Sequence, residues 1–123
     1  MIKKFDVKIW PVRLMNSCNN MVVVIREGII QWVNKKFVED TKLTKRLVVG
    51  SLVEDTFSPN FDAVYRKGEK ICNIRCVDLP MKFGRVLFCI KTNGLEEEYD
   101  KFNNLVVINK EVIERVKNLW NNQ

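Results

Sequence analysis

The four cysteines stand out for their chemistry in this sequence, because it contains no histidine. Cys72 and Cys76 lie four residues apart in a stretch that reads as a strand, so both would face the same side of a sheet. Cys89 belongs to the next predicted strand and can approach them, whereas Cys18 stands apart. Zinc and iron–sulfur sites usually use cysteine pairs with two-residue spacers, which this chain lacks. The sequence therefore predicts four free thiols, no metal and no cofactor.

Catalysis is disfavoured by the residues that are missing. Histidine is the commonest metal ligand and a frequent general base, so its absence also argues against a haem held by histidine. The sequence has no nucleophile elbow, no phosphate-binding P-loop and no kinase signature. Glu54 and Asp55 form an adjacent acidic pair, which a solvated short helix explains. We expect a protein that is not an enzyme.

Length and charge limit the class of protein further. The 123 residues, 46% of them hydrophobic, suit one domain with a sizeable core. No apolar run approaches the roughly 20 residues of a membrane span, so we expect a cytoplasmic protein without a membrane partner. The net charge of +6 permits contact with nucleic acid, but the basic residues alternate with acids and form no known binding motif. A nucleic-acid partner is therefore disfavoured, and a small basic nucleic-acid-associated regulatory protein is the alternative function.

The stretch from residue 21 to residue 57 carries the clearest structural signal. An apolar run at 21–25, a polar turn ending in Gly28 and a β-rich run at 29–33 predict a β-hairpin. Asn34 follows directly, and its side chain is well suited to cap the helix that the next residues predict. Apolar spacing predicts further short helices across residues 41–54, and helical spacing of Phe61, Val64 and Tyr65 continues this pattern within residues 58–67.

This order of elements resembles the PAS family of sensor and interaction domains. The family's entry reads as an apolar strand, an acidic-Gly turn, a second strand ending in Asn, a helix with an aromatic residue, and a later Gly followed by Leu and Phe. The matching positions here are Ile25, Gly28, Ile30, Val33, Asn34, Phe37, Gly50, Leu52 and Phe57. The match covers residues 21–57 well and residues 70–92 loosely, and it implies a sensor or association module.

The resemblance also implies a pocket between the sheet and the short helices. By the family's pattern, its lining would be Val24, Trp32, Phe37, Leu47, Leu52, Phe57, Phe61 and Phe88. So many large side chains can also fill this space completely, so a filled core and an open ligand pocket both remain. The photochemical branch of the family carries an Asn-Cys-Arg-Phe motif that is absent here, so cysteinyl-flavin chemistry is not expected.

After the helices, the family has three strands. Residues 70–79 and 85–92 read as strands, separated by a turn at residues 80–84. Only residues 69–93 are then available for all three strands and their turns. We therefore expect the first of the three to be short or fused with the second.

Residues 95–123 contain neither Pro nor Gly and predict one long helix. Their apolar positions alternate at four and three residues, which is typical of a coiled-coil seam, with one polar Asn that can set register. The seam, and the expected dimer interface, is Leu95, Tyr99, Phe102, Val106, Asn109, Ile113, Val116 and Trp120.

The sequence as a whole predicts an α+β fold: a PAS-like antiparallel sheet flanked by short helices, with a long C-terminal helix. The expected divisions are an N-terminal flank at 1–20, a PAS-like domain at 21–94 and a coiled-coil helix at 95–123. The predicted function is a sensory or protein–protein dimerisation module of a signal-transduction or transcriptional regulator, with room for a small ligand in its core. The expected partners are a second copy of the chain, a signalling partner or fused output domain, and a small-molecule ligand.

Overall fold

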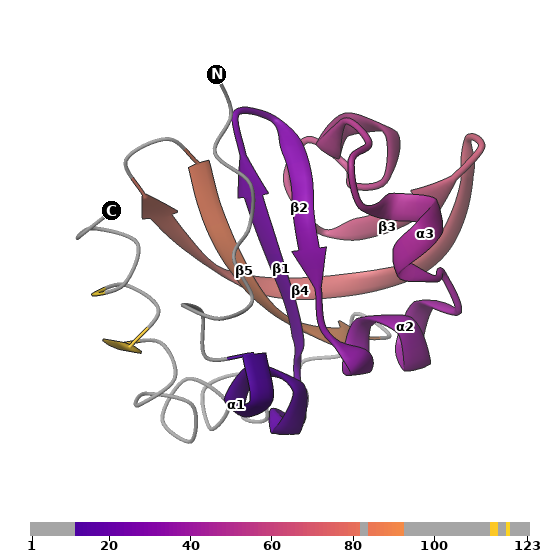
Figure 1. Ribbon diagram of the computed structural model, residues 1–123. Coiled ribbons are helices and arrows are strands. Elements are labelled where there is room, and N and C mark those ends of the chain that lie inside the picture. Colours follow the sequence, from indigo (N-terminus) through magenta and orange to yellow (C-terminus); the bar gives the residue numbers. More distant parts are fainter. Residues whose placement is uncertain (1–11, 82–83, 93–113, 116–117, 119–123) are drawn as a thin grey trace.

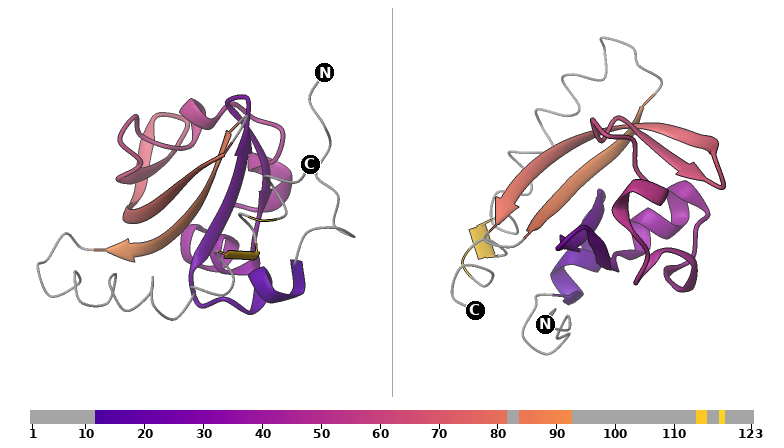
Figure 2. Two further views of the ribbon diagram at one scale, coloured as in Figure 1. Left: turned by 90° about the vertical axis from the view of Figure 1, so that its left-hand side faces the viewer. Right: turned by 90° about the horizontal axis from the view of Figure 1, so that it is seen from above.

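A computed structural model of the chain describes residues 12–81, 84–92, 114–115 and 118. Its centre is a five-stranded antiparallel sheet in the order β2-β1-β5-β4-β3, which curls around one side of the molecule (Figures 1 and 2). The elements in chain order are α1 (Val12–Ser17), β1 (Met21–Arg26), β2 (Ile29–Val33), α2 (Lys35–Thr41), α3 (Lys45–Val48), the 3-10 turn η1 (Val53–Asp55), β3 (Ala63–Arg66), β4 (Glu69–Met81) and β5 (Gly84–Thr92).

Two tight turns join neighbouring strands of this sheet. Glu27 and Gly28 between β1 and β2 have φ of 53° and 76°, and Lys67 and Gly68 between β3 and β4 have φ of 50° and 80°. Positive φ at both central residues is what a two-residue type I′ hairpin turn requires, and its twist matches that of the strands. The predicted hairpin of β1 and β2 is thereby confirmed.

Every side chain of β1 is buried, so both faces of this strand are covered by other elements. Met21, Val23 and Ile25 belong to the inner cluster, which also contains Phe37 of α2 and Val48 of α3. Val22 and Val24 belong to the outer cluster, together with residues of α1. A strand that is buried on both faces reads as a continuous apolar run, which explains the sequence of residues 21–25.

The predicted fold class is wrong. The described residues are mainly antiparallel sheet, and their helices α1, α2 and α3 have only 6, 7 and 4 residues. No long C-terminal helix is evident in the described part of the chain, where only Glu114, Arg115 and Asn118 represent residues 95–123. A heptad pattern shows where apolar side chains would fall along a helix, whereas helical stability depends mostly on what those side chains pack against.

The predicted interface lies outside the described residues. Its members are Leu95, Tyr99, Phe102, Val106, Asn109, Ile113, Val116 and Trp120. The same holds for residues 1–11 of the predicted N-terminal flank.

The helical interpretation of residues 58–67 is also wrong, because Ala63–Arg66 form the short strand β3. Helical spacing over so few residues cannot be distinguished from a short strand, and here pairing with β4 decides the outcome. Three strands therefore follow the helices, and the first is short as expected, but it lies at Ala63–Arg66, before the stretch 69–93 expected to hold all three. Strand β4 also runs through the predicted turn as far as Met81, with Pro80 paired to Arg85 of β5.

Candidate functional site

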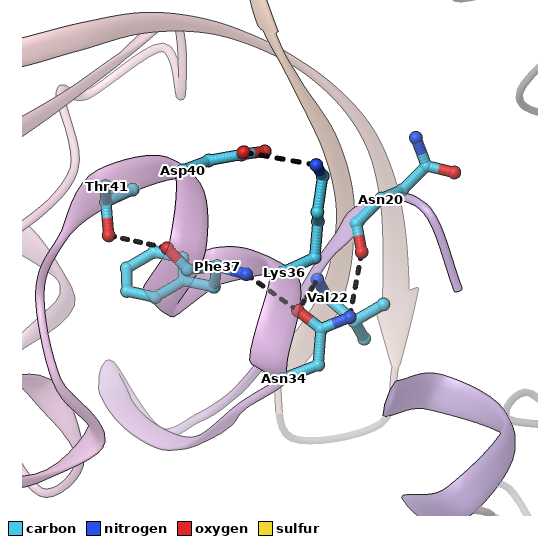
Figure 3. A network of polar contacts seen from close by, with 7 residues as sticks. All are labelled: Asn20, Val22, Asn34, Lys36, Phe37, Asp40 and Thr41. Atoms are coloured by element: carbon cyan, nitrogen blue, oxygen red, sulfur yellow. Dashed lines mark hydrogen bonds and ion pairs between the residues drawn. The ribbon is translucent and has the colours of Figure 1, made fainter. Parts of the chain in front are cut away.

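Asn34 is the centre of a buried polar junction between α1, β1 and α2 (Figure 3). Its Oδ1 accepts hydrogen bonds from the backbone N–H of Phe37, at 3.1 Å, and of Val22, at 2.9 Å. Its Nδ2 donates to the backbone oxygens of Met15 and Asn20, both at 2.8 Å. An amide side chain has two donors and one oxygen with two lone pairs, so the bonding capacity of Asn34 is fully used. The predicted helix cap is confirmed, and the junction has nothing left to offer a ligand.

Aromatic rings fill the space between the sheet and the short helices. The centroids of Phe37 and Phe57 lie 6.2 Å apart, and those of Phe57 and Phe61 lie 5.9 Å apart. Phe37 and Phe57 are buried in the inner cluster, and Phe61 packs against its edge. These rings therefore occupy the space between the sheet and the short helices in the described part of the chain.

The eight side chains predicted to line one pocket are distributed over three places. Phe37, Phe57 and Phe61 lie at the inner cluster. Val24, Trp32 and Phe88 lie in the cluster on the other face of the sheet, because successive residues of a strand point to opposite faces. Leu47 and Leu52 are each 48% exposed. The structure therefore does not bring this set together.

A groove of about 440 Å³ opens at the rim, beyond the aromatic rings, and we call it the Phe61 groove. It lies between the loop that precedes β3 and the long strand β4. Its lining combines apolar and hydrogen-bonding side chains: Asn60, Phe61, Asp62, Asn73, Ile74, Arg75, Cys76, Asp78 and Thr92. This volume falls within the roughly 300–1,000 Å³ of small-molecule sites, which combine apolar walls with a few polar groups.

The loop above the groove is held by Ser58. Its Oγ donates to Asp62 Oδ1 at 2.6 Å and accepts from the backbone N–H of Asp62 and of Ala63, each at 3.0 Å. The backbone oxygen of Asp62 in turn accepts from Ile74 N–H of β4 at 2.9 Å. These bonds fix the position of the loop relative to the floor of the groove.

Phe61 has an uncommon backbone conformation, with φ of 54°. The other non-glycine residues with positive φ in the described chain are Glu27 and Lys67 in hairpin turns, and Lys42 at the end of α2. A left-handed conformation is unfavourable for a bulky residue, and such strain clusters at functional sites. Phe61 also closes a turn, since its backbone N–H donates to Ser58 O at 3.0 Å, and it differs from the other three in being a bulky aromatic residue.

Arg85 connects Phe61 to the sheet. Its guanidinium carbon lies 4.8 Å from the centroid of the Phe61 ring, a cation–π distance. Its Nη1 lies 3.0 Å from Asp78 Oδ2, across the β4–β5 ladder. Arg85 thus links two residues that line the groove, the aromatic ring of Phe61 and the carboxylate of Asp78.

The thiol of Cys76 forms part of the floor of the Phe61 groove. Cys76 lines the groove and is directly opposite Cys89 of β5. Burial, followed by the hydrogen bond with Cys76, raises the pKa of the Cys89 thiol well above its ordinary value. Burial also raises the pKa of Cys18 and of Cys72. All four thiols are free, and within the described residues no three acidic, Cys or His side chains gather as a metal site.

A second, smaller groove of about 260 Å³ lies between α3 and the β3–β4 turn. Leu47 is the one member of the predicted ligand set that lines it, beside Leu43 and Val48. The opposite wall carries Tyr65, Arg66 and Lys67. No cysteine lines this groove, and its one non-glycine residue with positive φ is Lys67 of the hairpin turn.

Sequence reasoning missed most of the Phe61 groove. It identified Phe61 as a pocket residue and Cys76 as a thiol near Cys89, but not Asn60, Asp62 or Asp78. A usable signal was the turn-forming run from Ser58 to Asp62, because Ser, Pro, Asn and Asp favour local turns. Nothing in the sequence placed this turn over β4, since that depends on strand pairing.

No model of a known protein family matches this chain, and no curated protein matches it either. In the part of the chain that the structure describes, no helix has both the length and the apolar character to cross a membrane.

Proposed function

We propose that this chain is a sensory module related to the PAS family, and that it binds a small molecule in the Phe61 groove. The observation that carries the proposal is Phe61 itself, an aromatic residue with a left-handed backbone that lines a groove of ligand size. The element order gives further support, since a hairpin, an Asn cap, short helices and three strands follow one another as the resemblance implies. The proposed role is binding, without catalysis.

The ligand that suits this groove is a small molecule with an aromatic part and several hydrogen-bonding groups. Phe61 and Ile74 offer apolar contact, while Asn60 and Asn73 offer amide donors and acceptors. Asp78 is paired with Arg85 and Asp62 with Ser58, so the acidic groups of the lining are partly compensated. A neutral heteroaromatic compound fits this balance better than an ion of either sign.

Binding can be tested with a panel of heteroaromatic metabolites and amide chemical shifts of the labelled full chain. We expect a binding compound to shift the amides of Asn60, Ile74 and Cys76. Cys76→Phe would place a large ring in the groove and abolish these shifts. The matched variant Leu47→Phe fills the second groove and should leave them unchanged. Shifts that persist in Cys76→Phe but vanish in Leu47→Phe would move the site to the second groove and overturn the assignment.

Association is the second half of the proposal. A sensory module must pass its state on, and we propose pairing with a second copy or with a signalling partner in the cytoplasm. Four free thiols are typical of a reducing compartment, which supports this location. Light scattering of the purified chain, with and without a binding compound, measures self-association. A monomer under both conditions would exclude the homodimer and leave only a different partner.

A further inference from the structure

We infer that Cys76 and Cys89 form a peroxide-reactive thiol pair, in which a hydroperoxide entering the Phe61 groove is reduced and a cross-strand disulfide is formed. The inference goes beyond small-molecule binding, and it uses the proposed groove only as the route to Cys76. Three features of the structure carry it: the placement of the two thiols, their unequal access, and the pairing of Cys72 with Val64 of β3 rather than with a cysteine.

Placement comes from the strand register, in which Cys76 and Cys89 are directly opposite each other. Opposed residues of an antiparallel pair have Cα atoms about 4.5 or 5.5 Å apart, and both values fall within the roughly 4.4–6.8 Å found in disulfides. Both side chains lie on the inner face, where Cys89 is buried and Cys76 packs at the edge of the same cluster. The neighbouring Cys76 thiol is one of the causes that raise the pKa of Cys89.

Access differs between the two thiols and sets the order of events. Cys76 is partly exposed and lines the groove, whereas Cys89 lies beneath it with 1% of its surface exposed. A hydroperoxide can therefore reach Cys76 first, and Cys89 is placed to react only with the product at Cys76. This division into an accessible and a resolving cysteine is what redox-responsive sites require.

The reaction balances with a hydroperoxide as the oxidant. The Cys76 thiolate attacks one peroxide oxygen, the O–O bond breaks, and the other oxygen leaves as an alcohol, or as water from hydrogen peroxide, after taking a proton. Cys76 is then a sulfenic acid. The Cys89 sulfur, having lost its proton, attacks the Cys76 sulfur, the S–O bond breaks and the hydroxide leaves as water. Two thiols lose two electrons and two protons, and the hydroperoxide is reduced.

The resulting bond should be easily reduced again. Opposed Cβ atoms in a sheet are about 4.5–5.5 Å apart, whereas a disulfide prefers about 3.5–4.5 Å. Closing the bond must therefore pull β4 and β5 together locally, and strained disulfides are the labile, regulatory ones. The same movement takes the Cys76 sulfur away from the groove, so oxidation would change the shape of the proposed ligand site.

The other two cysteines are matched controls. Cys72 is on the same strand as Cys76 but is opposite Val64 of β3. Cys18 lies in the cluster on the other face of the sheet. Neither is placed to join Cys89 across the β4–β5 ladder, so the serine variants Cys72→Ser and Cys18→Ser should leave the reaction intact.

The test treats the reduced, folded chain with one equivalent of hydrogen peroxide and measures intact mass and tryptic peptides. Trypsin cleavage after Lys70, Arg75, Lys82, Arg85 and Lys91 would place Cys72, Cys76 and Cys89 on separate peptides, 71–75, 76–82 and 86–91. We expect the loss of two hydrogen atoms and a covalent link between peptides 76–82 and 86–91. Mild dithiol treatment should restore the reduced mass.

The Cys89→Ala variant should gain one oxygen atom at Cys76 and react with a sulfenic-acid reagent, because the resolving thiol is absent. The Cys76→Ser variant should remain unmodified at Cys89. Circular dichroism establishes that each variant is folded, and alanine is used at position 89 to avoid burying a hydroxyl group.

A link that involves Cys72, no link in the folded protein, or equal oxidation of Cys89 in Cys76→Ser would overturn the inference. Because this readout needs no bound ligand, its outcome is separable from that of the compound panel.

Discussion

Asn34 and Phe61 are both placed at a junction between a strand and another element, but their surroundings differ in kind. Asn34 is fully buried, has an ordinary extended backbone and uses every hydrogen bond that its side chain can make. Phe61 is half-buried, has a strained backbone and contacts a guanidinium group that is itself partly exposed. The first arrangement suits stability, because a satisfied buried polar network favours one structure. The second leaves surface and strain available for binding.

The largest expected effect is at the Asn34 junction. Asn34→Ala would remove the helix cap and leave two backbone N–H groups and two carbonyl oxygens without this partner. Each unsatisfied buried polar group costs roughly 1–3 kcal/mol, so for the four groups we expect a loss of at least about 4 kcal/mol in the free energy of unfolding. Urea denaturation measures this change.

Asn16→Ala is the matched control for this junction, since Asn16 accepts one exposed hydrogen bond from Lys35 N–H at 3.0 Å. Its loss should cost at most about 1 kcal/mol, because water can replace the bond. Equal costs for the two variants would contradict the distinction between the junction and the surface.

The buried thiol of Cys89, beneath the Phe61 groove, should make the free energy of unfolding decrease in alkali. Burial raises the pKa of Cys89 in the folded chain, so above the ordinary value of 9.0 the unfolded chain loses this proton first. The free energy of unfolding then decreases as pH rises toward the folded pKa, by at most about 1.4 kcal/mol per pH unit for one group. Unfolding of the native chain and of Cys89→Ala, compared between pH 8 and pH 10 (about the thiol range), isolates this contribution. Parallel pH profiles would show that Cys89 does not contribute.

Phe61→Asn should have a small effect on stability, because it relieves backbone strain while removing a ring that is only partly buried. Asn tolerates the left-handed conformation, where a bulky residue loses roughly 1–2 kcal/mol. We expect a net change within about 1 kcal/mol, together with loss of compound binding in the groove. Phe57→Ala is the contrast, with an expected cost of about 3–5 kcal/mol for a buried ring. A loss at Phe61 as large as that at Phe57 would show that Phe61 is simply part of the core.

The smallest expected effect is at the ion pair on the wall of the groove. Asp78 and Arg85 have side chains that are 42% and 40% exposed, so Asp78→Asn should cost only about 0.2–1 kcal/mol. The difference in the free energy of unfolding between the native chain and Asp78→Asn should shrink further in high salt, because dissolved ions screen exposed charges. Asp40→Asn, which breaks the surface pair with Lys36 in α2, is the reference. A much larger cost at Asp78 would show that this wall of the groove is rigidly built.

The sequence alone determined the elements whose signals are local. The hairpin of β1 and β2 follows from an apolar run and a Gly-containing turn, and the start of α2 follows from the capping Asn34. Each of these depends on residues within a few positions of one another. Cys76 and Cys89 could likewise be recognised as thiols on neighbouring strands.

Tertiary structure alone decided which face of the sheet each side chain occupies and which turns lie beside which strands. Val24, Trp32 and Phe88 are as apolar as Phe37 and Phe57, but strand register places the two groups in different clusters. Residues 63–66 became a strand because β4 was available to pair with them. The Phe61 groove is made by the same pairing, which brings the turn at Ser58 over β4. Such contacts join residues far apart in the chain, so local spacing carries no record of them.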